Sequence, residues 1–171
     1  MTKTNDLGTV LRDGDRIGLR YARDLMHPPE KVWRALTESE HMAAWMACDM
    51  VGERRTGAPI ELRLWPAIVE TAGSDFAVLP GVIRVWDRPN VFEWTWDNDV
   101  LRWELSEIDD GTRLIFTTWF AEQDTPLSDV GAGYHVWLDA LADHLDTGNG
   151  TPVAYRDLGP VESRYATIAQ L

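Results

Sequence analysis

The sequence predicts an α+β fold in which a curved antiparallel sheet wraps around one long C-terminal helix. Three observations lead to this prediction: alternating apolar positions through the middle of the chain, turn sequences between them, and a strong helical stripe near the end. Period-two alternation indicates strands with one buried face, whereas spacings of three and four indicate a helix. A bent sheet with the helix across its concave face buries every apolar stripe at once, which is the helix-grip arrangement.

The N-terminal part is expected to contain a loose segment followed by one strand. Residues 1–14 are polar and interrupted by Gly and Asp, so we expect them to be loosely ordered. Apolar and polar side chains then alternate over residues 16–25, which indicates a strand with Ile17, Leu19 and Tyr21 on its buried face.

Two short helices are expected next. Pro28 and Pro29 end the strand and preset φ for the first turn of a helix, where a missing N–H costs little. Thr37 and Glu40 match a capping box, which predicts the start of a second short helix over residues 39–45.

The middle of the chain reads as β-structure. Residues 59–65 alternate, whereas residues 66–80 have no clear period and are expected to form a loop. Tight turns near Asp97 and Asp109 predict an antiparallel meander that is apolar on one face. The expected strands of this region cover residues 81–87, 91–96, 100–108 and 112–120.

The strongest helical pattern lies close to the C-terminus. Apolar side chains recur at three and four over residues 128–147, where Ser128 or Asp129 can cap the start and Gly148 can end the helix. We therefore expect one domain over residues 15–147, followed by a C-terminal tail over residues 148–171 that contains at most a short helix.

Composition restricts the classes of partner. The 16 Lys and Arg against 28 Asp and Glu give a net charge of −12, which repels phosphate backbones and anionic lipids, so neither nucleic acid nor membrane is expected as a partner. Cys48 is the sole cysteine, which excludes an intrachain disulfide. Because no signal peptide or membrane-spanning stretch is recognisable, a cytoplasmic location is expected.

Four motifs carry a resemblance to a known family. Residues 27–45, 88–96, 101–120 and 131–145 occur in the order found in the SRPBCC superfamily of START and pollen-allergen-like domains. Within it, the sequence is most similar to bacterial members of the family named after the activator of heat-shock-protein ATPase. The resemblance covers about residues 15–147 and implies the helix-grip fold with an apolar cavity between sheet and helix. In a few relatives it implies catalysis on, or transport of, a hydrophobic molecule.

Nine tryptophans in 171 residues indicate an interior built from bulky surfaces. The main hypothesis is that these surfaces enclose a cavity for an apolar, aromatic small molecule, and ordinary core packing is the alternative. No cofactor is expected. The candidate ligand-binding residues are Leu62, Leu64, Trp94, Trp96, Trp103, Leu105, Phe116, Tyr134, Leu138 and Leu141.

Two other functions stay open. A cyclase- or hydratase-like enzyme would use polar groups in the same cavity, and Tyr134 and His135 would be the first residues to test. His135 and Asp139 stand at i and i+4, and we interpret them as a surface or helix-stabilising pair at the edge of the buried stripe rather than as a general base oriented by a carboxylate. The family name suggests a module that binds a chaperone ATPase. A homodimer formed through the sheet edge or the tail is also left open.

A metal centre is not expected. His41, Cys48 and Asp49 are candidate ligands by type, but their spacing matches no structural or catalytic zinc pattern. Cys48 is interpreted as a small buried side chain, because the acidic Asp49 beside it raises the pKa of a thiol. The polar positions Glu93 and Arg102 alternate with the apolar face and are assigned to the solvated outside of the sheet.

Overall fold

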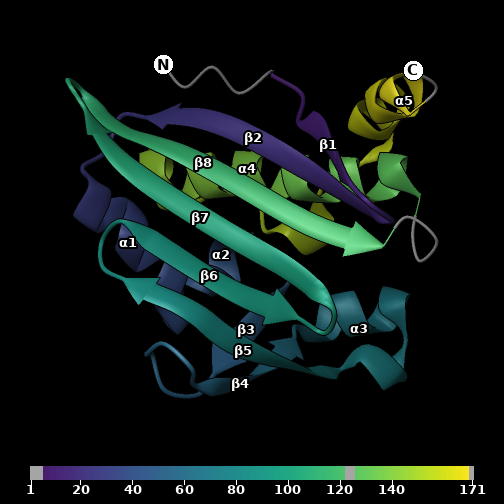
Figure 1. The fold of residues 1–171 in the computed structure, drawn as a ribbon, viewed down its shortest axis with the longest axis horizontal. Coiled ribbons are helices and arrows are strands. Elements are labelled where there is room, and N and C mark those ends of the chain that lie inside the picture. The colour runs from purple at the N-terminus through teal and green to yellow at the C-terminus, as the bar shows by residue number, and fades with distance from the viewer. Residues whose placement is uncertain (1–5, 122–125, 170–171) are drawn as a thin grey trace.

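Antiparallel strands form one unclosed, eight-stranded sheet, which confirms the predicted α+β class (Figure 1). The computed structural model describes residues 6–121 and 126–169. Along the sheet the strands follow the order β1-β2-β8-β7-β6-β5-β4-β3. The strands are β1 (Thr9–Asp13), β2 (Arg16–Leu25), β3 (Cys48–Val51), β4 (Pro59–Leu64), β5 (Val78–Asp87), β6 (Val91–Trp96), β7 (Asp99–Ile108) and β8 (Gly111–Ala121).

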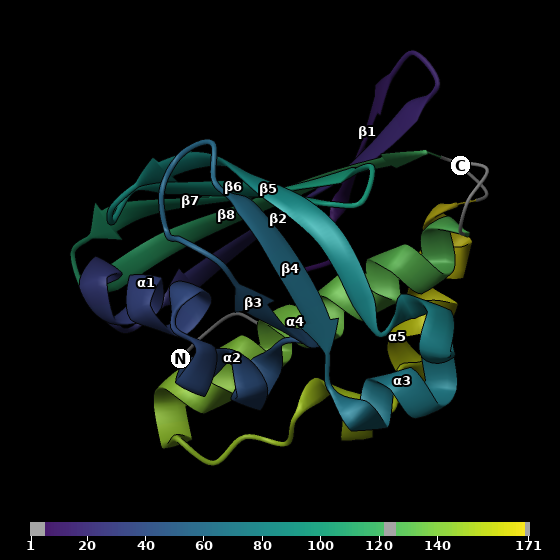
Figure 2. The ribbon, with the colours of Figure 1, turned by 90° about the horizontal axis from the view of Figure 1, so that it is seen from below.

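The helices gather on one side of this sheet. Figure 2 shows the sheet arching over the long helix α4, and α1 and α2 lie beside one part of α4. Helix α5 packs against α4, and so does α2. The helices are α1 (Pro29–Thr37), α2 (Ser39–Trp45), α3 (Pro66–Ala72), α4 (Leu127–Thr147) and α5 (Gly159–Ile168), with short 3-10 turns at Ser74–Phe76 and Val153–Tyr155. The helix-grip arrangement predicted from the apolar stripes is thereby confirmed.

Register across the meander places large rings in one row. Phe92 of β6 lies opposite Trp103 of β7, which lies opposite Phe116 of β8, which lies opposite Tyr21 of β2. All four side chains are buried. The row therefore runs across the inner face of the sheet, toward α4, as the period-two alternation predicts.

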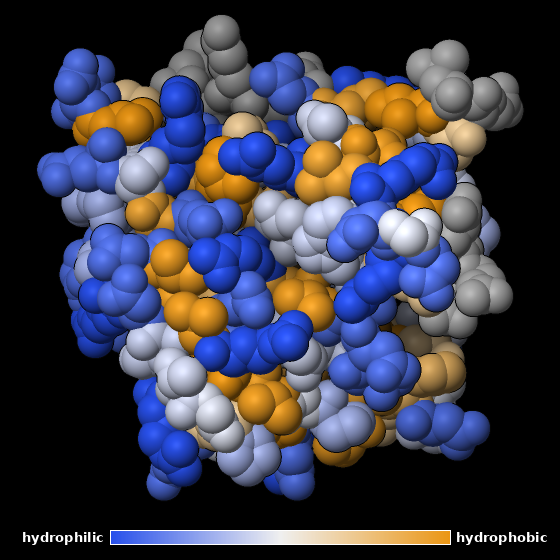
Figure 3. All heavy atoms as spheres, in the orientation of Figure 1, coloured by the Kyte–Doolittle hydropathy of each residue, from blue (hydrophilic) through white to orange (hydrophobic). Residues whose placement is uncertain are grey.

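The opposite face of the sheet is mixed in character. In Figure 3, which views this outer face, hydrophilic residues lie between hydrophobic ones. Arg102 of β7 donates hydrogen bonds to Glu93 on the neighbouring strand β6 at 2.8 Å and to Glu104 on its own strand at 3.3 Å. This arrangement agrees with the assignment of Glu93 and Arg102 to the solvated outside.

Three segments differ from the predicted secondary structure. Residues Thr9–Asp13 form β1, so the expectation of a loose segment is wrong for them: their backbone pairs with the free edge of β2, and the sequence has no apolar alternation to reveal this. Residues 66–80 contain α3, which Pro66 begins and Gly73 ends at a φ of 101°. Because α3 buries none of its side chains, it leaves no apolar stripe. The short strand β3 at Cys48–Val51 was also not predicted.

Helix ends also depart from the predicted caps. Thr37 does not cap α2, because its hydroxyl donates to the carbonyl of Trp33 at 2.8 Å, within the preceding helix. Pro126 stands at the N-cap of α4, which carries no side-chain cap, so the proposed roles of Ser128 and Asp129 are wrong. Gly148 does end α4 in the left-handed conformation, with a φ of 72°.

Candidate functional site

Closely spaced rings fill much of the interface between sheet and α4. Trp103 and Phe116 stack with centroids 4.0 Å apart, and Phe116 lies 5.1 Å from the ring of Tyr134 on α4. Tyr134 in turn meets Trp137 edge-on at 5.0 Å. We call this set the aromatic palm: Phe92, Trp94, Trp96, Trp103, Phe116, Tyr134 and Trp137. Such offset and edge-on ring pairs stabilise the fold beyond the area they bury.

The ten predicted ligand-binding residues all belong to, or pack against, one apolar core. Seven are buried, namely Leu62, Trp94, Trp103, Leu105, Phe116, Leu138 and Leu141. Three are half-buried, namely Leu64, Trp96 and Tyr134. Whether they contact a ligand stays a prediction. A small molecule can reach the three half-buried residues without moving the core, because part of each side chain is exposed.

One of the half-buried residues lines a pocket. Between the start of β7 and the first turns of α4 lies a pocket of about 200 Å³, lined by Asp99, Val130, Gly133, Tyr134 and Trp137. We call it the Tyr134 pocket. No atom outside the helix backbone lies within 4 Å of the position that a Cβ on Gly133 would take, so this glycine leaves space at the pocket wall.

One buried hydroxyl lies beside this pocket. The Thr118 hydroxyl is buried, makes no hydrogen bond of ordinary geometry among the described residues, and is close enough to the Tyr134 hydroxyl to lower the pKa of that phenol. The Trp94 indole N–H, two strands away in the register of the inner sheet face, is also buried without a partner among the described residues. A buried donor without a well-formed hydrogen bond costs free energy, so a ligand or a water that reaches the Thr118 hydroxyl stabilises it.

The chemistry of the Tyr134 pocket favours binding over proton transfer. Burial raises the pKa of the Tyr134 hydroxyl above its ordinary value, and the charge of Asp99 adds to this increase. The phenol therefore keeps its proton and donates a hydrogen bond rather than acting as a base. Cys48 offers no nucleophile either, because burial together with Asp49 raises the pKa of its thiol.

A second polar region lies where β2, α4 and α5 meet, and we call it the Arg23 cluster: Tyr21, Arg23, His135, Asp139 and Tyr165. His135 is only 1% exposed, so the prediction of a surface position is wrong, whereas the predicted proximity to Asp139 is present. Its Nδ1 lies 3.1 Å from the Tyr165 hydroxyl, and its Nε2 lies 3.7 Å from an Asp139 carboxylate oxygen. The reason for the error is α5, which covers this side of α4 and was not predicted to pack there.

The Tyr165 hydroxyl connects the two ends of the chain. It accepts a hydrogen bond from the Gly8 backbone N–H at 2.8 Å, and Tyr21 donates to the Gly131 carbonyl at 2.9 Å. A Cβ on Gly131 would lie 2.4 Å from Cδ1 of Tyr165, so only glycine fits where α5 crosses α4. The segments before β2 and after α4 are therefore tied to the same core.

Arg23 is a buried cation that the sequence analysis missed. It is 2% exposed, donates from Nη1 to its neighbouring Ala22 carbonyl at 2.9 Å, and leaves Nε and Nη2 without partners among the described residues. Burial lowers its pKa, an effect that nearby Asp139 opposes. The sequence contains a signal that could have revealed it. Position 23 continues the alternation of Ile17, Leu19 and Tyr21, so the charged side chain falls on the buried face of β2.

Asp139 responds to the same surroundings. Burial raises the pKa of its carboxyl to about 6, although the positive charges of Arg23 and Arg156 act in the opposite direction. One of its oxygens, Oδ1, is buried without a hydrogen-bond partner among the described residues. Desolvation thus outweighs the attraction of the nearby cations at this carboxyl.

Comparisons with known proteins identify the family and the fold. The family described as "Activator of Hsp90 ATPase homolog 1-like protein" matches residues 26–146. No functionally curated protein matches the sequence. Among the helices of the described residues, none is long and apolar enough to cross a membrane.

Solved structures share the architecture at low sequence identity. A conserved protein of unknown function, EF2215 from Enterococcus faecalis, superposes with a TM-score of 0.79 at 21% identity, over 95% of this chain and 90% of its own. CalU16 from Micromonospora echinospora gives 0.67 at 19% identity, over 100% and 99% of the two chains. The Aha1 dimer from Colwellia psychrerythraea gives 0.63 at 18% identity, over 78% and 98%. At these identities the likeness supports the fold alone.

Proposed function

We propose that this chain, which belongs to the family of Activator of Hsp90 ATPase homolog 1-like proteins, binds an apolar small molecule in the Tyr134 pocket. The observation that carries the proposal is the pocket of about 200 Å³ beside α4, whose Tyr134 hydroxyl lies beside the buried hydroxyl of Thr118. The aromatic palm supplies a rigid apolar wall behind it. A pocket of this kind is suited to recognition of a small, mainly apolar ligand.

The size of the pocket limits the ligand. A cavity of about 150 Å³ holds a benzene molecule, so about 200 Å³ fits one aromatic ring with a short substituent. The rings of Tyr134 and Trp137 can contact such a ligand face-on or edge-on. Burying ~200 Å² of ligand surface contributes about 5 kcal/mol before the costs of association.

The polar groups near the pocket specify one end of the ligand. The hydroxyls of Tyr134 and Thr118 can both donate a hydrogen bond, so a carbonyl or ether oxygen on the ligand complements them. Asp99 at the pocket wall and the net charge of −12 disfavour an anionic ligand. A neutral aromatic compound with one acceptor is therefore the proposed class.

The same observations give less support to the alternative functions. Turnover by a cyclase- or hydratase-like mechanism needs a group that exchanges protons near neutral pH, and the raised pKa of Tyr134 works against that role. The family description names the Hsp90 ATPase, and one structural relative is an Aha1 dimer. Chaperone contact and self-association remain separate proposals, which sedimentation of the chain alone and with an Hsp90-type ATPase distinguishes.

The test compares toluene with acetophenone, which share a ring but differ by a carbonyl acceptor. Both are titrated into the ¹⁵N-labelled chain and followed by two-dimensional NMR. We expect both to shift the signals of residues 130–137, and acetophenone to bind about fivefold more tightly because it gains one hydrogen bond of ~1 kcal/mol. Failure of both probes to shift these signals would overturn the proposal.

Two variants locate the binding site. Gly133→Leu places a side chain in the open space of the pocket, and we expect it to abolish binding while the fold is kept, since leucine favours helix more than glycine does. Thr147→Leu, an exposed position at the far end of the same helix, is the matched control and should leave binding unchanged. Thr118→Val should remove the preference for acetophenone but keep toluene binding.

A further inference from the structure

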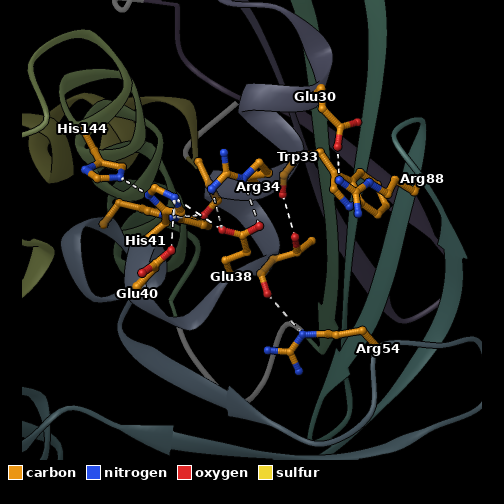
Figure 4. A network of polar contacts seen from close by, with 12 residues as sticks. Glu30, Trp33, Arg34, Glu38, Glu40, His41, Arg54, Arg88 and His144 are labelled. Atoms are coloured by element: carbon orange, nitrogen blue, oxygen red, sulfur yellow. Dashed lines mark hydrogen bonds and ion pairs between the residues drawn. The ribbon is translucent and has the colours of Figure 1, made fainter.

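A cluster of histidines and carboxylates lies at the C-terminal end of α4, where α2 packs against it. Figure 4 shows the ring of His41 between His144 on one side and the carboxylates of Glu38 and Glu40 on the other. His41 Nδ1 lies 3.0 Å from His144 Nε2. His41 Nε2 lies 3.6 Å from a Glu38 oxygen and 4.0 Å from a Glu40 oxygen.

We infer that Glu38, Glu40 and His41 bind a divalent transition-metal ion such as Zn²⁺, and that His144 positions the ring of His41. This site is separate from the proposed ligand pocket. His144 follows Tyr134 by ten residues on α4, which corresponds to about 15 Å along the helix axis. Loss of one site is therefore not expected to remove the other.

The donor atoms match the preferences of such an ion. One imidazole nitrogen with two carboxylate oxygens suits Zn²⁺ and its neighbours, whereas Ca²⁺ and Mg²⁺ favour oxygen ligands throughout. The ligand atoms of Glu38, Glu40 and His41 all lie within 4.8 Å of one another. Ligand distances of about 2.1 Å in a tetrahedron place neighbouring ligand atoms about 3.4 Å apart.

Only a small adjustment brings these atoms to that spacing. The pair formed by His41 and Glu38 is already at 3.6 Å. The Glu40 side chain has to approach further, and it is free to do so because it is 76% exposed. Three protein ligands leave a fourth tetrahedral position for water, as in zinc sites that remain accessible to solvent.

His144 supplies the support that a metal-binding histidine requires. A ligand that uses Nε2 carries its proton on Nδ1 and usually donates it to a neighbouring acceptor, which fixes the ring. His144 Nε2 stands in that acceptor position at 3.0 Å from His41 Nδ1. The Nδ1 atom of His144 is buried without a partner among the described residues, so no other contact there competes for its orientation.

Arg34 opposes metal binding. Its guanidinium donates to both oxygens of Glu38, at 3.0 and 3.3 Å, and holds part of the negative charge that the ion needs. An ion must share Glu38 with this cation or displace it. Removal of the competing charge by Arg34→Gln should therefore strengthen metal binding, and this sign distinguishes a real coordination site from a purely structural polar network.

The experiment titrates the chelator-treated, full-length chain with ZnCl₂ by calorimetry. We expect one ion to bind per chain in the presence of excess Mg²⁺ and to raise the melting temperature. His41→Gln and Glu40→Gln should each weaken binding at least ~10-fold, because each loses a ligand. Glu40 is exposed, so its variant tests the site without disturbing the fold.

Variants of His144 test its positioning role, and His27 provides the control. His144→Phe should weaken Zn²⁺ binding about 10–100-fold, whereas His144→Gln, which keeps an acceptor, should lose less. His27 is another histidine beside a carboxylate, 2.6 Å from Asp146, and His27→Gln should change nothing. Absence of Zn²⁺ binding, or binding unaltered by His41→Gln and Glu40→Gln and hence adventitious, would overturn the inference.

Discussion

The aromatic palm and the Arg23 cluster are both buried between the sheet and its helices, but they are stabilised in different ways. In the palm, rings such as Trp103 and Phe116 contact one another and require mainly the right volume. In the cluster, His135 depends on the Tyr165 hydroxyl, and Arg23 is buried with two nitrogens unpartnered among the described residues. One interior therefore contains a region tolerant of exchange among apolar residues beside a polar region whose stability depends on individual contacts.

The two regions also join different parts of the chain. The palm is formed mainly by strands that follow one another in a meander, together with α4. The cluster connects Gly8, before the first strand, to Tyr165 in the last helix and to Tyr21 in β2. Long-range contacts of the second kind close the molecule at its termini. We therefore expect a substitution in the palm to affect stability most, and one in the cluster to loosen mainly the terminal segments.

The largest effect is expected for Trp103→Ala in the palm. Trp103 is buried, and its ring contacts those of Trp45 and Phe116. In the neighbouring strand it lies opposite Phe92. Removal of this ring should lower the free energy of unfolding by about 3–5 kcal/mol, through lost transfer energy and the cavity that remains. Denaturation by urea, monitored by circular dichroism, measures this change.

A matched control separates burial from ring size. Trp119 lies on β8, the strand after that of Trp103, and is half-buried. Its ring covers Gly18 of β2. Trp119→Ala removes the same side chain from outside the palm, so a clearly smaller loss is expected. If both variants lose the same free energy of unfolding, a ring in the palm stabilises the fold no more than a half-buried ring near the surface does.

An intermediate effect is expected for Tyr165→Phe in the Arg23 cluster. The change removes only the hydroxyl that contacts the Gly8 N–H and His135, and both are buried. Leaving these groups without a partner should cost about 2 kcal/mol. Hydrogen exchange should be faster at Gly8 and in β1 than in the meander. Tyr155→Phe, at a 71% exposed position, is the control and should alter neither measurement.

The sequence was sufficient to predict the palm. Strict alternation in β6, β7 and β8 assigned Phe92, Trp94, Trp103 and Phe116 to one face, and the turns fixed the pairing of adjacent strands. Both signals are local, because side-chain direction and hairpin register depend on neighbouring residues. The apolar stripe of α4 placed that helix across the concave face of the sheet, and the family resemblance implied the same arrangement. The volume left between the rings is not a local property, and the Tyr134 pocket could not be located in advance.

The polar regions could not be predicted in the same way. His135 was assigned to a surface because the packing of α5 over α4 depends on residues far apart in sequence. His41 was compared with Cys48 and Asp49, its neighbours in sequence, whereas its close partner in space is His144, 103 positions away. Polar partners carry no periodicity, so their pairing appears only once the helices are placed.

The smallest effect is expected for Asp139→Asn, and it depends on pH. The pKa of Asp139 is raised by burial to about 6, above its ordinary value of 3.8, so the folded state binds this proton more tightly than the unfolded state. Its contribution to stability is therefore greatest below pH ~4, falls as the pH rises toward 6, and reaches its least favourable value above that. The charges near it belong to Arg23, Arg156, Asp143 and Arg164.

Asp139→Asn should remove this dependence and stabilise the fold at pH 8 by about 1 kcal/mol, less than the full shift implies because the side chain is partly exposed. Unfolding free energies at pH 4, 6 and 8 measure the change. Asp129→Asn removes an exposed carboxylate from the same helix that is not among the charges acting on Asp139, and it should leave the slope between pH 4 and 6 as it is in the original chain. If Asp129→Asn flattens the slope equally, general charge repulsion rather than burial of Asp139 governs the pH response, and the contrast between cluster and surface is lost.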